Sequence, residues 1–171
     1  NLKTSEEVLD LIILSIERTG LIYLDDISIA LDCAASELFS KDSYKLTGEN
    51  KKFSSDEMVF YMQALVDKYE IKSVEDPFDE KDWDAWKTFT KNNNDLQIVG
   101  DDIFVTQEKI LRKGIDSKVA NSILVKLNQV GTLSETMQAI SLAKNNGYET
   151  IISHRSGETE DSFIADLAVA V

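Results

Sequence analysis

Short apolar runs typical of β-strands recur along the chain, and each one ends on a polar or charged residue. From Glu75 onward these terminal residues recur every 25 to 28 positions, which is the length of one strand plus one helix. Strands joined by crossover helices run parallel, so we expect all five strand ends to gather at one edge of a sheet. The runs are residues 29–32, 71–75, 97–101, 122–126 and 150–154.

Helical spacing fills most of the gaps between these runs. Residues 4–7, 54–57 and 132–135 have capping-box spacing and precede apolar positions at helical intervals. The first of these predicted helices should pack on the sheet and end at Gly20. Thr106 is expected to cap a short helix ending at Gly114, and residues 128–131 are expected to form a loop.

Two further segments complete the predicted order of elements. A helix over residues 79–89 places Trp83, Trp86 and Phe89 on one stripe, which is typical of core packing. Residues 33–53 break the strand–helix pattern and predict a small hairpin or excursion around residues 44–46.

The fold class predicted by this order is α/β. Five strand–helix units fit either an open doubly wound sheet or part of an eight-stranded (β/α) barrel. No glycine-rich phosphate-binding fingerprint follows the first strand, which favours a partial TIM-like barrel with about five parallel strands. Residues 1–171 contain no linker composition and predict one domain. The chain starts without methionine and stops inside an apolar helical run, so we expect an incomplete segment of a longer protein.

Composition narrows the classes of function. A chain of 171 residues that is 43% hydrophobic can bury a sizeable core. Its formal net charge of -13 argues against direct nucleic-acid binding and favours divalent cations. The single cysteine, Cys33, excludes an intrachain disulfide and fits a reducing compartment such as the cytoplasm. No apolar run approaches the roughly 18 residues of a membrane span.

Acidic residues end three successive predicted strands. Asp32, Glu75 and Asp101 offer hard oxygen ligands of the kind that Mg²⁺ prefers. Each one alone could instead cap the following helix. The three together favour a magnesium site at the strand ends.

The last two strands deliver basic residues. Lys126 ends an apolar run, and beside a divalent cation its ammonium form would be disfavoured, which would make the neutral amine available as a base. The alternative is a surface lysine at the rim. His154 is the only histidine, and a lone histidine is more often structural than catalytic. Arg155 and Ser156 follow it and suit a phosphate group.

The segments at these strand ends resemble motifs of the enolase family, in the family's order and over essentially the whole chain. They are Ala-Leu-Asp-Cys-Ala-Ala-Ser-Glu at 30–37, Ser-Val-Glu-Asp-Pro-Phe-Asp-Glu at 73–80, Val-Gly-Asp-Asp at 99–102, Lys-Leu-Asn-Gln-Val-Gly at 126–131 and Ser-His-Arg-Ser-Gly-Glu-Thr-Glu-Asp at 153–161.

The resemblance implies a segment of a carboxy-terminal barrel domain and the reversible dehydration of 2-phosphoglycerate to phosphoenolpyruvate in glycolysis. It implies that Lys126 removes the C2 proton and that His154 lies at the substrate. Arg155 and Ser156 match the residues that hold the phosphate. The matched magnesium ligands are Asp32, Glu75 and Asp101, and a second Mg²⁺ joins with the substrate.

The chain also departs from the family pattern. The amino-terminal domain, the first barrel strands with their glutamates and the last strand with its lysine are not present in it. We therefore expect the segment alone to be inactive and to expose sheet edges, while the parent enzyme is active as a homodimer or higher oligomer in the cytoplasm.

Two alternatives to this function stay open. One is another metal-dependent enzyme of the enolase superfamily that acts on a different carboxylate. The other is a non-catalytic binding role, either to plasminogen at the cell surface or to an RNA-degradation scaffold. No basic or terminal-lysine docking motif favours the second.

Overall fold

A parallel sheet forms the centre of the computed structural model, which describes residues 2–157 and 159–171. Its strand order is β1-β4-β5-β6-β7, as the strand–helix repeat predicts. Glu158, which falls within the segment 153–161 discussed above, lies outside the described residues, as does Asn1. The strands of the sheet are β1 (Ala30–Asp32), β4 (Ser73–Glu75), β5 (Gln97–Gly100), β6 (Ser122–Val125) and β7 (Glu149–Ile152).

The register aligns the strand ends. Asp32 lies opposite Glu75, and Glu75 lies opposite Val99, so the carboxyl ends of β1, β4 and β5 are adjacent. The strands are shorter than the predicted runs. Asp101 and Lys126 follow the last residues of β5 and β6, and His154 lies two positions beyond β7. The chemistry-bearing side chains therefore come mostly from the first residues after each strand.

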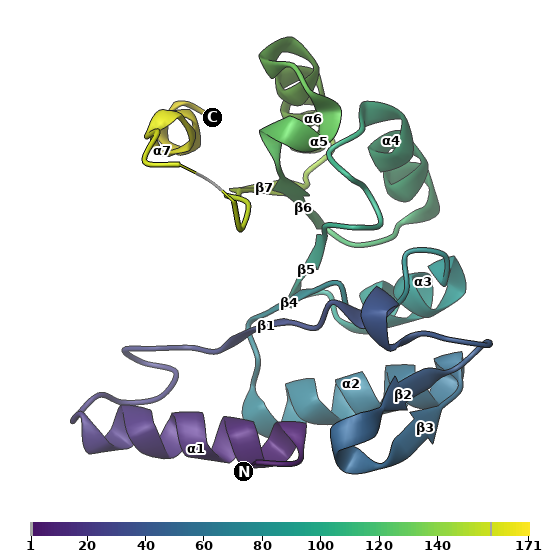
Figure 1. Ribbon diagram of the computed structural model, residues 1–171, viewed down its shortest axis with the longest axis vertical. Helices are drawn as coiled ribbons and strands as arrows, with labels where there is room; N and C mark the ends of the chain where they lie inside the picture. Colours follow the sequence, from purple (N-terminus) through teal and green to yellow (C-terminus); the bar gives the residue numbers. More distant parts are fainter. Residues whose placement is uncertain (1, 158) are drawn as a thin grey trace.

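Helices follow most of the strands and cover the sheet (Figure 1). The excursion predicted between residues 33 and 53 is an antiparallel hairpin of β2 (Tyr44–Leu46) and β3 (Lys51–Phe53). The helices are α1 (Ser5–Arg18), α2 (Ser55–Tyr69), α3 (Trp83–Asn92), α4 (Glu108–Ser117), α5 (Leu127–Val130), α6 (Leu133–Asn145) and α7 (Phe163–Ala170), with 3-10 turns η1 (Ala35–Leu38) and η2 (Thr47–Glu49). The single turn α5 replaces most of the loop predicted over residues 128–131.

The three predicted capping positions are confirmed. Thr4, Ser54 and Thr132 each accept a hydrogen bond from the backbone amide three residues later, and Ser54 forms a complete reciprocal box with Glu57. Gly20 has a φ of +84°, as expected for the residue that follows α1.

The predicted role of Thr106 as a helix cap is wrong. Helix α4 follows Gln107, has no side-chain cap and continues through Gly114 to Ser117. Thr106 is fully buried with a φ of +55°, and its hydroxyl accepts the backbone N–H of Lys126 at 2.9 Å. The Thr106 hydroxyl therefore bonds to the main chain that follows β6, and not to the first turn of α4.

The aromatic stripe of α3 packs into the core as predicted for two of its members. Trp86 and Phe89 are fully buried. Trp83 is partly buried, and the ammonium of Lys113 lies 3.7 Å from its ring centroid. Strand β6 is buried along its whole length.

The sheet is open, with β1 and β7 as its edge strands. Helix α1 runs beside α2 next to the β1 edge (Figure 1) and buries Leu9 and Ile16. Ile13 is partly buried, whereas the other apolar side chains Val8, Leu11, Ile12 and Leu14 are exposed. None of the described helices is long and apolar enough to cross a membrane.

Candidate active site at the strand ends

The three acids predicted as metal ligands come from adjacent strands. Asp32 and Glu75 are paired residues at the ends of β1 and β4, and Asp101 is the first residue after β5. Burial and, after it, the charges of Asp32 and Asp101 together raise the pKa of Glu75 to about 7. Glu75 is therefore a half-buried carboxyl group in the negative field of its neighbours.

The predicted base contacts one of these acids. The Lys126 ammonium donates a hydrogen bond to Asp101 Oδ2, and the two side chains are only 16% and 10% exposed. Gln129, one turn after Lys126, donates from Nε2 to the other oxygen of Asp101 at 3.3 Å. The prediction that an amine meets the carboxylates at the sheet edge is therefore confirmed for this pair.

The buried Thr106 holds the main chain of Lys126. The Thr106 hydroxyl accepts the Lys126 amide and lies 2.8 Å from Gln129 Oε1, to which it can donate. The Thr106 hydroxyl thus links the main chain of Lys126 to the side chain of Gln129. The side chain of Gln129 is in turn hydrogen-bonded to Asp101. The sequence reasoning missed both residues, although Gln129 lies within the quoted segment 126–131.

Two further acids lie at this edge and were also missed. Within the described part of the chain, one group of three acidic residues has oxygen atoms that all lie within 4.8 Å of one another, and it consists of Asp76, Asp101 and Asp102. This group shares only Asp101 with the predicted ligand set. Asp76 and Asp102 directly follow Glu75 and Asp101, so their position next to a predicted ligand was the available signal.

Burial raises the pKa of Asp76 to about 7, against the lowering effect of hydrogen bonds from the amides of Asp102 and Asp101. The pKa of Asp102 is also raised, first by burial and then by the charge of Asp101. Burial first, and then the charges of neighbouring carboxylates, thus disfavour ionisation of these acids.

The residues predicted to bind substrate lie on the exposed segment that follows β7. His154, Arg155 and Ser156 follow β7 and are exposed. The described side-chain hydrogen bonds of Ser153 and His154 stay within this segment, with His154 Nδ1 3.1 Å from the Arg155 carbonyl oxygen. The structure therefore does not join these three side chains to Lys126 or Asp101, and their roles stay predictions.

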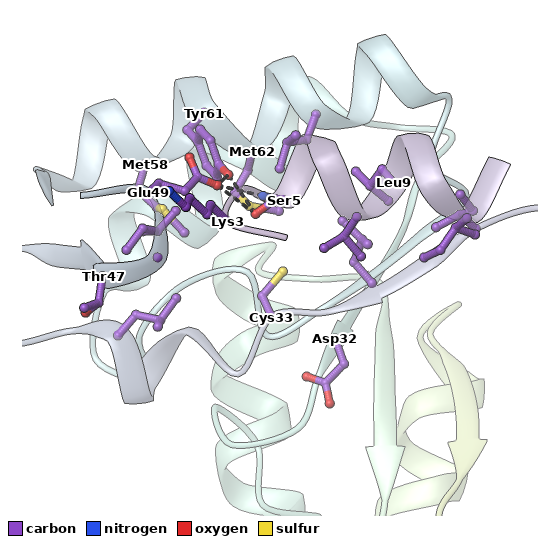
Figure 2. Close-up of a pocket in the computed structure, with 18 of the residues that line it drawn as sticks. Lys3, Ser5, Leu9, Asp32, Cys33, Thr47, Glu49, Met58, Tyr61 and Met62 are labelled. Carbon is purple, nitrogen blue, oxygen red and sulfur yellow. Dashed lines mark hydrogen bonds between the residues drawn. The ribbon is translucent and has the colours of Figure 1, made fainter. Parts of the chain in front are cut away.

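An apolar cavity lies between β1 and the helices α1 and α2. It has a volume of about 560 Å³ and is lined mostly by apolar side chains of α1, α2 and the residues around β1. Figure 2 shows that the Cys33 sulfur points toward the helices, whereas the Asp32 carboxylate points away from them. Burial raises the pKa of the Cys33 thiol to about 12, so this thiol is a poor nucleophile. Of the predicted metal ligands and base at the strand ends, only Asp32 is among the residues that line this cavity.

The donor set at the strand ends fits a divalent cation. Carboxylate oxygens are the ligands that Mg²⁺ takes, and a dipositive ion would relieve the repulsion that raises the pKa of Glu75. Lys126 is the cation paired with this group. The residues at this edge are Asp32, Glu75, Asp76, Asp101, Asp102 and Lys126.

Comparisons with known proteins show the family of the chain. The family model described as "Enolase, C-terminal TIM barrel domain" matches residues 1–171. Enolases of Legionella pneumophila strains Corby and Paris are each 54% identical to the chain over 171 residues. The matches cover 99% of this chain and 40% of each relative, so the chain spans less than half the length of the relatives it matches. An open five-stranded parallel sheet with this family match means that the chain belongs to the enolase family, as a segment of its C-terminal TIM barrel domain.

Proposed function

We propose that the full-length protein reversibly dehydrates 2-phosphoglycerate to phosphoenolpyruvate and that this segment supplies its metal ligands and its base. The observation that carries the proposal is the contact between Lys126 and Asp101 at the ends of adjoining strands. This contact puts the amine of Lys126 beside a carboxylate that would bind the metal ion. Removal of a proton from the carbon next to the substrate's metal-bound carboxylate requires a base in such a position.

Asp32, Glu75 and Asp101 would hold Mg²⁺ at this edge. Bound there, Mg²⁺ would offset the negative charge that develops on the substrate carboxylate when the C2 proton leaves. Asp101 would then be shared between the ion and Lys126, which weakens the hold of Asp101 on the ammonium group.

Lys126 in its neutral form would accept the C2 proton and become an ammonium ion. The electron pair of the broken C–H bond would form the C2–C3 double bond as hydroxide leaves C3. The acid that protonates this hydroxide has to come from the remainder of the full-length protein. For this reason we expect the 171-residue segment alone to be inactive.

His154, Arg155 and Ser156 would complete the substrate site. The guanidinium of Arg155 and the hydroxyl of Ser156 suit the phosphate group, and His154 would contact the substrate near Lys126. Their exposure at the end of β7 leaves them accessible to a ligand. We place the parent enzyme in the cytoplasm as a homodimer or higher oligomer.

Two measurements test the proposal. Full-length protein is assayed for phosphoenolpyruvate formation from 2-phosphoglycerate with and without Mg²⁺, beside other hydroxy carboxylates. Magnesium binding is measured by calorimetry for the wild type and for the triple variant Asp32→Ala, Glu75→Ala, Asp101→Ala. Turnover that needs Mg²⁺ and binding that is lost in the triple variant are expected. A wild type that acts only on a different carboxylate would contradict the substrate, and binding retained in the triple variant would contradict the ligand set.

A further inference from the structure

The side chain of Asp76 is bonded to the main chain at the end of β5. Its Oδ1 accepts the N–H of Asp101 at 2.9 Å, and its Oδ2 accepts the N–H of Asp102 at 2.9 Å. Asp76 is only 3% exposed. Both oxygens of a buried carboxylate are therefore used to fix two consecutive amides.

The backbone of Asp76 connects two more strand ends. Its N–H donates to the Val99 carbonyl at 3.1 Å, and its carbonyl accepts the N–H of Ala35 at 3.1 Å. Just before it, the Glu75 carbonyl accepts the N–H of Cys33 at 2.9 Å. The main chains that follow β1, β4 and β5 are thus joined at one residue.

Asp76 has the left-handed φ of +43°, which is unfavourable for an aspartate outside a turn that requires it. Such a conformation persists only where the surrounding structure holds it, and it is found most often at functional sites. Here the conformation directs the carboxylate across the sheet to the Asp101 and Asp102 amides, while Glu75 remains in the strand. The strained position and the double amide contact are parts of one arrangement.

We infer that Asp76 is a positioning residue that holds the main chain of Asp101, and through it the Asp101 carboxylate, in place for the metal ion and Lys126. The inference rests on the proposed function, because it assigns Asp76 to the site that Asp32, Glu75 and Asp101 would form. Asp76 belongs to the group of acids that come within 4.8 Å of one another, but its oxygens point at amide hydrogens. Outer partners of this kind orient the ligands that bind the ion directly.

The test is Asp76→Asn in the full-length protein. An asparagine keeps the size of the side chain, but its amide nitrogen cannot accept an N–H, so one of the two contacts is lost. The matched control is Asp79→Asn, because Asp79 is also buried at 7% exposure and its carboxylate accepts the Lys81 amide at 3.0 Å. Both variants lose one buried carboxylate charge, and only one of them loses a contact to Asp101 or Asp102.

Three quantities are measured: the Kd for Mg²⁺ by calorimetry, kcat and KM for 2-phosphoglycerate, and amide hydrogen exchange over residues 99–106 in the metal-free protein. For Asp76→Asn we expect a Kd raised about 10- to 100-fold and faster exchange at Asp101 and Asp102. Asp79→Asn should leave the Kd and this exchange at the wild-type level. A Kd within twofold of the wild type in Asp76→Asn would overturn the inference.

A second outcome would also overturn it. If Asp76→Asn loses Mg²⁺ while exchange at Asp101 and Asp102 stays at the wild-type rate, Asp76 is a direct ligand. If this variant does not fold, Asp76→Glu is measured in the same way. It keeps the charge and moves the oxygens by one methylene, so the inference still expects weaker binding and faster exchange, and wild-type values for both overturn it. Failure of the wild type to bind Mg²⁺ would instead count against the proposed function, while the exchange measurement would still test the contact itself.

Discussion

Lys126 on the end of β6 and Asp101 on the end of β5 form an ion pair that is largely shielded from water. Removing one partner of such a pair leaves the other charge buried and uncompensated, which is strongly unfavourable. Asp101 also lies beside Asp76 and Asp102, and repulsion between the three carboxylates makes an unpaired charge on Asp101 still less favourable. In the absence of metal, Lys126 is the cation that pairs with Asp101, and a divalent ion would compete with Lys126 for the same carboxylate.

Lys126→Met in the full-length protein separates the two roles of the lysine. Loss of a general base should lower kcat by about 10²- to 10⁴-fold. Magnesium binding should persist and become tighter, because the ion no longer competes with an ammonium group for Asp101. Turnover and calorimetric Mg²⁺ titration measure the two effects, with Lys72→Met, which changes an exposed lysine before β4, as the control. A variant that keeps more than a tenth of the wild-type kcat would exclude Lys126 as the base.

Magnesium binding should depend on pH through Glu75. Its pKa is raised to about 7 by burial first and then by Asp32, Asp101 and Asp76, with Lys126 opposing the shift. Between the ordinary glutamate pKa of 4.5 and about 7, the folded metal-free protein binds more protons than the unfolded chain. Its stability should therefore fall as pH rises through this range.

Because Mg²⁺ binds ionised carboxylates, its affinity should rise over the same range, and binding at pH 6 should release protons. Calorimetry in two buffers of different ionisation enthalpy measures the release. Glu75→Gln should release fewer protons but not zero, since the pKa of Asp76 is also raised to about 7. Glu108→Gln, a change of an exposed glutamate on α4, should release as many as the wild type. Equal release by wild type and Glu75→Gln would contradict the assignment of Glu75.

A different carboxylate should control acid stability. Glu49 accepts hydrogen bonds from the Ser5 amide at 2.9 Å, the Ser5 hydroxyl at 3.1 Å, the Tyr61 hydroxyl at 2.8 Å and Lys51 at 2.7 Å, which ties η2 to the start of α1. Burial alone would raise its pKa, but these partners outweigh burial and lower the pKa to about 2.

A lowered pKa means that the stabilisation is complete above the ordinary pKa of 4.5 and is lost as pH falls toward 2. Glu49→Gln should therefore reduce the free energy of unfolding at pH 7 by about 1–3 kcal/mol, and the difference from the wild type should shrink by pH 3. Chemical denaturation of the full-length protein at both pH values measures this. Glu6→Gln, which changes an exposed partner of Lys68, serves as control. A difference that does not change with pH would show that shape, not charge, makes Glu49 important.

Periodicity was enough to predict the parallel sheet, because crossover helices leave the strands no other direction. It also brought Asp101 and Lys126 to one edge, since each ends a run in neighbouring units. The contacts of Asp76 and Thr106 could not be predicted in this way. Both depend on positive φ values, +43° and +55°, that direct a side chain across the sheet to another strand end. Apolar spacing carries no information about such main-chain turns. For this reason the sequence predicts an ordinary helix cap at Thr106.

Gly114 shows how the core limits substitution next to the site. Within a helix, alanine is normally more favourable than glycine by about 1 kcal/mol. A Cβ on Gly114 would, however, lie 2.4 Å from Cε1 of the fully buried Phe104, and a Cβ on Gly100 would lie 2.5 Å from Cδ2 of the same ring. The ring is held between β5 and α4 with glycine on both sides, so it cannot move away from one without meeting the other.

Gly114→Ala should therefore destabilise the full-length protein by about 1–3 kcal/mol, the usual range for overpacking, in spite of the helix preference. Phe104→Leu in the same background should recover part of the loss, because a smaller side chain makes room for the methyl group. Arg112→Ala, an exposed change two positions earlier in α4, should stay within about 0.5 kcal/mol of the wild type. Denaturant unfolding of the four proteins completes the comparison. If Gly114→Ala were as stable as the wild type, Phe104 would have a second position available, and the packing under the Asp101–Asp102 turn would be looser than these contacts indicate.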